Sequence, residues 1–123
     1  EIFIYGDGKT SRDFCYIDNV VQVNILAACS KNKDALGEVF NVAYGDRTSL
    51  NNLFKEIETN LIKLTNKQKF PKPNYVDFRA GDVRHSLADI SKAKNLLGYN
   101  PKFSLKSGLK EATKWYVDNM SKI

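Results

Sequence analysis

The feature that most constrains the fold is a pair of glycines, Gly6 and Gly8, in the stretch IYGDGKTSRDF. Two glycines so close together oppose a helix, because glycine is among the least favourable residues in a helix interior. Stretches rich in β-branched and aromatic residues lie on both sides, at residues 2–5 and 14–17. The glycines are therefore predicted to form a tight turn between two short strands.

The same stretch imitates three motifs that bind phosphate or nucleotides, and each comparison fails. A P-loop ends in Gly-Lys-Thr, as residues 8–10 do, but it needs a glycine where Phe3 stands and a helix directly after it. A dinucleotide fingerprint needs a third glycine where Ser11 stands. Tyr5 and Lys9 have the Tyr-x-x-x-Lys spacing of a dehydrogenase catalytic pair, but that pair acts from one face of a helix. The turn needs another explanation.

Composition excludes several other classes of function. The 123 residues suffice for one domain with one core, and their net charge of +5 comes from scattered lysines rather than from an arginine-rich helix. Surface charge is therefore favoured over a nucleic-acid site. The sequence has no apolar run of about 18 residues that would span a membrane. His85 is the only histidine, and Cys15 and Cys29 lack ligand spacing, so no metal site is predicted and both cysteines are expected to be buried thiols.

Hydrophobic spacing and capping residues predict alternating helices and strands, hence a mixed α/β or an α+β fold. Helices are expected at residues 20–28, 50–61, 89–98 and 105–120, and further strands at residues 38–43 and 75–78. The expected caps are Asp18 or Asn19, Thr48 or Ser49, Asp89, and Ser104. Residues 20–28 carry apolar side chains on more than one face, so that helix is expected to be buried. Trp115 and Tyr116 are expected in the core.

Four segments in order resemble one family, the extended short-chain dehydrogenase/reductases that act as NAD-dependent nucleotide-sugar epimerases and dehydratases. The segments are YGDGKTSRDFCYIDNVVQVN, EVFNVAYGDRTSL, FRAGDVRHSLADISKAKNLLGYNP and GLKEATKWY. TSRDFCYIDN and GDVRHSLADISKA most resemble the bacterial UDP-N-acetylglucosamine 4-epimerases of surface-polysaccharide (O-antigen or capsule) synthesis. The resemblance spans essentially residues 1–123 and implies a mixed α/β fold: the C-terminal nucleotide-sugar-binding region of such an enzyme, without most of its Rossmann domain.

The resemblance assigns roles to residues at two places in the chain. Arg12 and Arg79 are expected on the diphosphate, since planar guanidinium groups match phosphate oxygens, and Asp82 is expected to accept hydrogen bonds from the ribose hydroxyls. Tyr5 is expected against the nucleotide base. The alternatives are that Arg12 pairs with Asp13 or Asp18, that residues 79–82 form a surface turn with an internal ion pair, and that Tyr5 is a buried strand residue.

Three further positions follow from the resemblance with less specific roles. Asn41 and Arg84 are expected at the rim of the substrate site; for His85 two interpretations stay open, the same rim and a plain surface turn. Lys9, which the P-loop motif would use, becomes a solvent-facing loop residue. The substrate-binding residues expected in the chain are therefore Tyr5, Arg12, Asn41, Arg79, Asp82 and Arg84.

The resemblance also implies what residues 1–123 lack. The NAD site and the catalytic base of the family lie in an N-terminal part, so the chain is expected to be a fragment without catalytic, cofactor-binding or metal-binding residues and inactive alone. The whole protein is expected to be a cytoplasmic homodimer that binds a UDP-sugar, and neither nucleic acid nor membranes. The same region of a dTDP-glucose 4,6-dehydratase, of a UDP-uronate decarboxylase or epimerase, or a stand-alone nucleotide-sugar-binding module remain alternatives.

Overall fold

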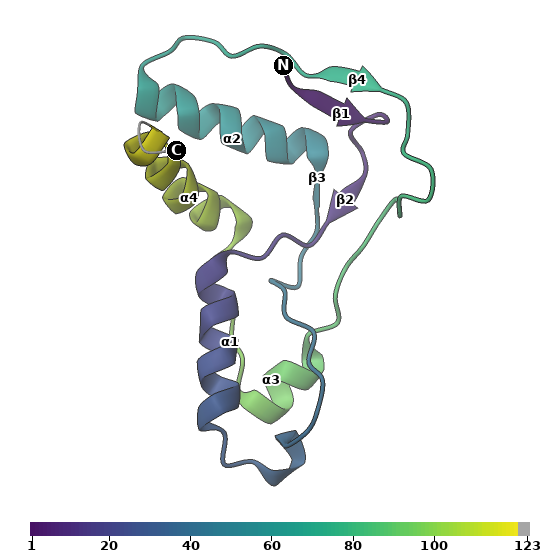
Figure 1. Cartoon of the computed structure of the whole chain (residues 1–123), viewed down its shortest axis with the longest axis vertical. Helices are drawn as coiled ribbons and strands as arrows, with labels where there is room; N and C mark the ends of the chain where they lie inside the picture. The colour runs from purple at the N-terminus through teal and green to yellow at the C-terminus, as the bar shows by residue number, and fades with distance from the viewer. Residues whose placement is uncertain (121–123) are drawn as a thin grey trace. The chain divides into compact units, whose positions relative to one another are not determined.

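The structure is a computed structural model that describes residues 1–120 and divides into two compact units (Figure 1). The first unit contains residues 1–12, 48–86 and those from 109 onward, and the second contains residues 13–47 and 87–108. Helices and strands both occur, so the mixed α/β class predicted from the sequence is confirmed. None of the helices within residues 1–120 is long and apolar enough to cross a membrane.

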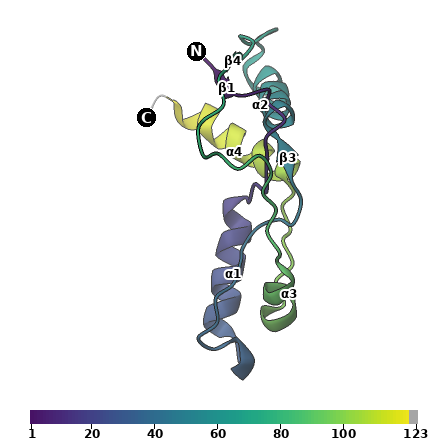
Figure 2. The ribbon, with the colours of Figure 1, turned by 90° about the vertical axis from the view of Figure 1, so that its right-hand side faces the viewer.

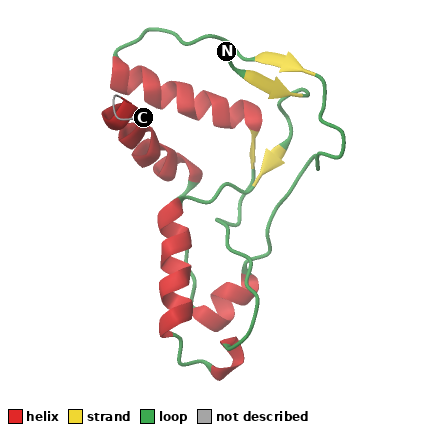
Figure 3. Ribbon diagram, in the orientation of Figure 1, coloured by secondary structure: helices red, strands yellow, loops and turns green. Residues whose placement is uncertain are grey.

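Four short strands belong to the first unit and are drawn in yellow in Figure 3. β1 (Phe3–Tyr5) pairs in parallel with β4 (Asn74–Val76), and the two lie side by side in both views (Figure 1, Figure 2). β2 (Ser11–Arg12) pairs antiparallel with β3 (Thr48–Ser49). The glycine turn connects β1 to β2, so the predicted turn is confirmed, but the strand predicted after it at residues 14–17 is not formed.

Helix α2 (Leu50–Thr65) follows β3 directly and carries the predicted stripe of half-buried apolar residues. Ser49 is its N-cap, because its hydroxyl accepts a hydrogen bond of 3.3 Å from the backbone N–H of Asn52. The helix ends at Thr65, and the left-handed backbone of the next residue, Asn66 (φ 55°), prevents continuation. Local sequence signals were sufficient for this element.

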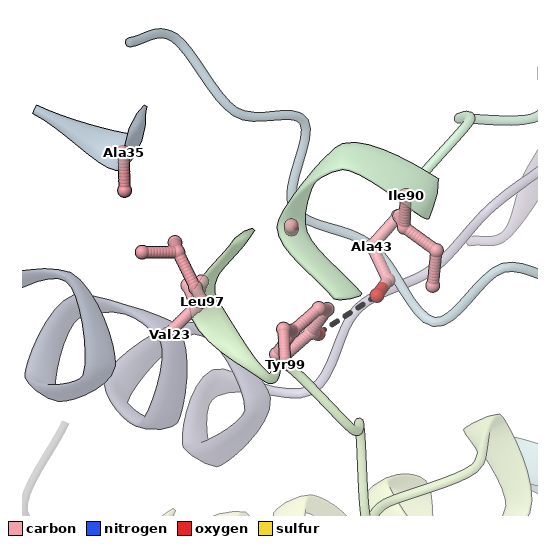
Figure 4. Close-up of a cluster of buried hydrophobic side chains, with 7 residues drawn as sticks. Val23, Ala35, Ala43, Ile90, Leu97 and Tyr99 are labelled. Carbon is pink, nitrogen blue, oxygen red and sulfur yellow. Dashed lines mark hydrogen bonds between the residues drawn. The ribbon is translucent and has the colours of Figure 1, made fainter. Parts of the chain in front are cut away.

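The second unit is built from α1 (Ile17–Cys29), the short 3-10 helix η1 (Lys33–Ala35) and α3 (Ser91–Leu97). A buried cluster joins them: Val23, Ala35, Ala43, Ile90, Ala93, Leu97 and Tyr99 (Figure 4). The Tyr99 hydroxyl donates a hydrogen bond of 2.8 Å to the carbonyl oxygen of Ala43, which Figure 4 draws as a dashed line. Burial raises the pKa of Tyr99, so the phenol stays protonated and remains a donor.

A fully buried amide, Asn19, fixes the segment that follows α3. Its side-chain nitrogen donates to the carbonyl of Phe103 (2.8 Å), and its oxygen accepts from the backbone N–H groups of Lys102 (2.9 Å) and Phe103 (3.0 Å). Asp18 or Asn19 was expected to cap α1, but the helix begins at Ile17 and leaves both residues inside it. The remaining helix, α4 (Leu105–Asn119), is capped by Ser104 as predicted, through a 3.3 Å hydrogen bond from the backbone N–H of Ser107.

Two predicted strands are wrong. Residues 13–16 are irregular and Ile17 begins a helix, and residues 38–43 form neither strand nor helix. Both stretches have the composition of strands, but β-propensity describes fitness for a sheet surface and does not supply the hydrogen-bonding partner. Val39, at the centre of the second stretch, is 83% exposed.

Three predictions of burial are also wrong for the described chain. On α1, the side chains of Ile17, Val21 and Ile25 are exposed, so that this helix buries one face only. Trp115 and Tyr116 on α4 are likewise exposed and pack edge to face on each other, with ring centroids 5.1 Å apart. Cys29 is exposed and Cys15 half-buried. Helical spacing shows which residues share a face, but it does not show whether another element covers that face.

Candidate functional site

The glycine turn of the first unit is shaped by two close approaches. Gly6 (φ +80°) faces the ring of Phe78, so that a Cβ atom at this position would lie 2.1 Å from the ring carbon Cε1. Gly8 (φ +71°) faces Asn51, and a Cβ atom there would lie 1.9 Å from its side-chain oxygen. Each glycine is therefore required both for its left-handed backbone and for lack of space. The hollow of the turn is filled by the protein's own side chains.

Asn51, on the first turn of α2, holds the turn in place. Its side-chain nitrogen donates to the carbonyl of Asp7 (3.2 Å), and its backbone N–H donates to the carbonyl of Gly8 (3.0 Å). Its side-chain oxygen accepts from the Tyr75 hydroxyl (2.8 Å). Sequence reasoning missed this residue, because no local pattern distinguishes an asparagine that bonds a turn 44 residues earlier.

Residues 84–86 run alongside β2, and this brings the segment FRAGDVRH (residues 78–85) next to the glycine turn and Arg12. The backbone N–H of Ser11 donates to the carbonyl of Arg84 (3.0 Å), and that of Ser86 donates to the carbonyl of Ser11 (3.1 Å). The Ser11 hydroxyl is hydrogen-bonded to Nδ1 of His85 at 2.9 Å. These contacts place two arginine-containing segments, distant in sequence, next to each other within one unit.

Arg12 lies at the end of β2 and forms an ion pair with Asp82. The distance between Arg12 Nη2 and Asp82 Oδ1 is 2.5 Å. Arg12 Nη1 donates to the carbonyl of Ser11 (2.9 Å) and, more weakly, to that of Arg84 (3.5 Å). The sequence had left Asp13 or Asp18 as alternative partners, and the structure gives Arg12 a partner 70 residues later.

Two more arginines lie on aromatic rings of the same unit. The guanidinium carbon of Arg79 lies 3.9 Å from the centroid of the Tyr5 ring, a cation–π distance. That of Arg84 lies 5.1 Å from the centroid of Phe78, while its Nη2 is 2.6 Å from Asp7 Oδ2. The hydrogen bond from Arg84, together with one from the backbone N–H of Lys9, lowers the pKa of Asp7. One face of Tyr5 is thus occupied by Arg79.

The structure brings five of the six predicted site residues into the first unit: Tyr5, Arg12, Arg79, Asp82 and Arg84. The sixth, Asn41, belongs to the second unit, where its side-chain nitrogen donates to the carbonyl of Asp89 at 3.3 Å. The Lys9 side chain is exposed, as predicted. Three guanidinium groups therefore lie near the glycine turn, whereas the lysine of the turn is exposed. The paired planar donors of a guanidinium group suit phosphate oxygens.

The surroundings of the glycine turn differ from those of a dinucleotide-binding loop. The glycines of the turn are packed against Phe78 and Asn51, and the turn leads into β2 rather than into a helix whose N–H groups could face a pyrophosphate. Within residues 1–120, no group of three or more His, Cys, Asp or Glu side chains is placed to hold a metal ion. The arrangement is suited to an anionic organic ligand.

Comparison with known proteins is consistent with this chemistry. Residues 1–112 match the family GDP-mannose 4,6 dehydratase. The UDP-glucuronate 4-epimerase of Thermodesulfobacterium geofontis is 36% identical over 99% of the chain and 35% of its own length. The dTDP-glucose 4,6-dehydratase of Haemophilus influenzae is 33% identical over 96% of the chain and 36% of its own length.

Solved structures agree. The UDP-glucose 4-epimerase of Thermotoga maritima, crystallised with UDP-glucose, superposes with a TM-score of 0.79 at 40% identity, over 98% of this chain and 36% of that one. The UDP-N-acetylglucosamine 4-epimerase of Methanobrevibacter ruminantium, in complex with UDP-N-acetylmuramic acid, gives a TM-score of 0.81 at 36% identity over the same shares. The chain spans about a third of the length of these relatives. It belongs to the GDP-mannose 4,6 dehydratase family, within the extended short-chain dehydrogenase/reductases.

Proposed function

We propose that this chain forms the part of an NAD-dependent nucleotide-sugar enzyme that binds the UDP portion of its substrate. The observation that carries the proposal is the gathering of Arg12, Arg79 and Arg84 with Asp82 and Tyr5 in one compact unit. A diphosphate requires bidentate cationic donors, a ribose requires an acceptor for its diol, and a base requires an apolar surface. The unit contains a side chain for each of these needs.

In this proposal Arg12 and Arg79 bind the two phosphates, Asp82 accepts hydrogen bonds from the ribose hydroxyls, and Tyr5 lies beside the base. Arg84, whose carbonyl is 3.5 Å from Arg12 Nη1, completes the rim. Fixing the diphosphate places the sugar for reaction, because orientation of a bound substrate lowers the entropic cost of the chemical step.

For the substrate we propose a UDP-N-acetylhexosamine, with interconversion of its gluco and galacto forms at carbon 4 in surface-polysaccharide synthesis. The similarity to the Methanobrevibacter ruminantium enzyme, a UDP-N-acetylglucosamine 4-epimerase, supports this choice. The similarity to the Haemophilus influenzae dTDP-glucose 4,6-dehydratase supports the second candidate, a dehydratase. The resemblance also leads us to expect a cytoplasmic homodimer.

NAD accompanies several related structures, among them the UDP-glucuronic acid 4-epimerase of Bacillus cereus in complex with UDP-glucuronic acid and NAD. NAD would supply a hydride acceptor for the sugar. Because the glycine turn of this chain is filled by Phe78 and Asn51, we propose that NAD and the catalytic base are provided by another part of the whole enzyme, and that these 123 residues alone catalyse no turnover.

The test is a substrate panel on the purified whole protein with NAD. We expect UDP-N-acetylglucosamine to be converted to UDP-N-acetylgalactosamine, followed by chromatography of the nucleotide sugars. Formation of a 4-keto-6-deoxy product from dTDP-glucose would favour the dehydratase, and loss of CO₂ from UDP-glucuronate would favour a decarboxylase. Binding of UDP without any turnover would indicate a stand-alone binding module. If no nucleotide sugar binds, the proposal is wrong.

A further inference from the structure

Arg12 is already occupied by groups of the protein before any ligand arrives. Asp82 takes one nitrogen of its guanidinium at 2.5 Å, and the carbonyl of Ser11 takes the other at 2.9 Å. Both side chains of the ion pair remain accessible to water, with 29% of Arg12 and 40% of Asp82 exposed. The ion pair therefore lies where an incoming ligand can reach it.

An anion that binds Arg12 has to compete with the Asp82 carboxylate. A ligand that carries phosphate alone would displace this carboxylate and offer it no donor in exchange. A nucleoside diphosphate would also separate Asp82 from the Arg12 guanidinium, but its ribose hydroxyls could then donate hydrogen bonds to the Asp82 carboxylate. The two kinds of ligand therefore differ in whether they supply hydrogen-bond donors to the Asp82 carboxylate.

From this geometry we propose that Asp82 is a specificity-determining residue: it blocks Arg12 against ligands that carry phosphate alone and releases it to ligands that also present a diol. The inference rests on the proposed function, because it assumes that the same two side chains receive the phosphate and the ribose. The new element is that Asp82, the residue proposed to bind the ribose, also competes with phosphate ligands for Arg12.

The exposure of the Arg12–Asp82 ion pair determines how strongly Asp82 lowers the affinity of Arg12 for a phosphate ligand. Ion pairs that are open to solvent contribute weakly, so that Asp82 should reduce the affinity of a bare phosphate ligand by about two- to fivefold. Such a factor disfavours inorganic phosphate and pyrophosphate without preventing the binding of a ligand that makes many other contacts.

The chain offers a matched control in its other arginine–aspartate pair. Arg84 and Asp7 are 2.6 Å apart; Asp7 is 40% exposed, the same as Asp82, while Arg84 is more exposed than Arg12, at 42% against 29%. Asp7→Asn removes the same charge from the same unit and leaves Arg12 paired with Asp82. It separates a general electrostatic effect from a specific release of Arg12.

The experiment measures calorimetric affinities of inorganic pyrophosphate and of UDP for the whole protein, as wild type, Asp82→Asn and Asp7→Asn, with circular dichroism to verify folding. We expect Asp82→Asn to bind pyrophosphate about two- to fivefold more tightly than the wild type. Its affinity for UDP should not rise, so the ratio of UDP to pyrophosphate affinity falls. Asp7→Asn should leave that ratio within about twofold of the wild type.

Three results would overturn the inference: unchanged pyrophosphate affinity in Asp82→Asn, an equal gain in Asp7→Asn, or an equal gain for UDP and pyrophosphate in Asp82→Asn. Failure of the proposed function has a different signature, namely that wild type does not bind UDP. In that case the pyrophosphate measurements still decide whether Asp82 blocks Arg12.

Discussion

Replacing Gly8 with alanine should destabilise the glycine turn by two separate effects. The backbone at Gly8 has φ +71°, a left-handed conformation that costs an L-residue about 1–2 kcal/mol. In addition, the new Cβ atom would lie 1.9 Å from the side-chain oxygen of Asn51, so Asn51 must move. Its movement breaks the hydrogen bonds to the carbonyl of Asp7 and from the Tyr75 hydroxyl.

The loss of these two exposed hydrogen bonds should cost about 1–2 kcal/mol, the lower part of the usual range for two bonds. The expected total for Gly8→Ala is therefore about 2–4 kcal/mol in the free energy of unfolding. Gly81 provides the control, since it belongs to the same unit, has φ +77° and would meet no atom within 4 Å. Gly81→Ala should cost only the backbone term of about 1–2 kcal/mol.

The assay is urea unfolding followed by circular dichroism, with Asn51→Ala as a third variant. In the Asn51→Ala background, Gly8→Ala should cost no more than Gly81→Ala, because the side chain that it would hit is gone. Two results would refute the reasoning: equal costs of Gly8→Ala and Gly81→Ala in the wild type, or a Gly8→Ala cost that is unchanged by removal of Asn51.

Three further predictions concern side chains of the two units. Tyr5→Phe should preserve both the aromatic surface beside the base and the cation–π contact with Arg79, whereas Tyr5→Leu should weaken the binding of UDP and of uridine by about 0.5–1 kcal/mol; unchanged uridine binding would show that Tyr5 does not contact the base. Tyr99→Phe should lower the stability by about 1–3 kcal/mol, because the buried carbonyl of Ala43 loses its donor, and a thermal melt equal to that of the wild type would contradict this. Because the pKa of Asp7 is lowered in the folded protein, its carboxylate binds a proton more readily in the unfolded chain than in the folded one. Its ion pair should thus stabilise the fold above the ordinary pKa of 3.8 and cease to do so as the pH falls through the folded-state pKa, so that the stability difference between wild type and Asp7→Asn shrinks on acidification; a difference independent of pH would exclude this role.

Predictions from the sequence succeeded where the determinants are local. Ser49 and the apolar stripe of α2 act within a few residues of each other, and so does Gly98, which ends α3 in a left-handed conformation (φ +68°). The glycine turn was predicted for the same reason, since two glycines suffice to oppose a helix. Capping and periodicity are properties of a short stretch of chain.

The sequence failed where a distant partner decides the outcome. Residues 14–17 and 38–43 have strand composition, but strands form only with a partner that local composition does not reveal. Asn19 was read as a cap and instead holds the backbone at Phe103, 84 residues later. The ion pair between Arg12 and Asp82 could not be predicted from spacing either, because residues 84–86 reach β2 only in the folded chain.

In the proposed site, the diphosphate is bound by Arg12 and not by the glycine–lysine segment of the turn. The most direct test is the affinity of the whole protein for UDP after Arg12→Ala and after Lys9→Ala. We expect Arg12→Ala to cost about 1.5–3 kcal/mol, roughly ten- to a hundredfold in affinity, since hydrogen bonds to a charged group are lost. Lys9 is exposed in the turn, so Lys9→Ala should change the affinity by less than about 0.5 kcal/mol. Arg12→Lys should restore only part of the loss, because lysine lacks the planar pair of donors. A loss in Lys9→Ala as large as that in Arg12→Ala would contradict the account.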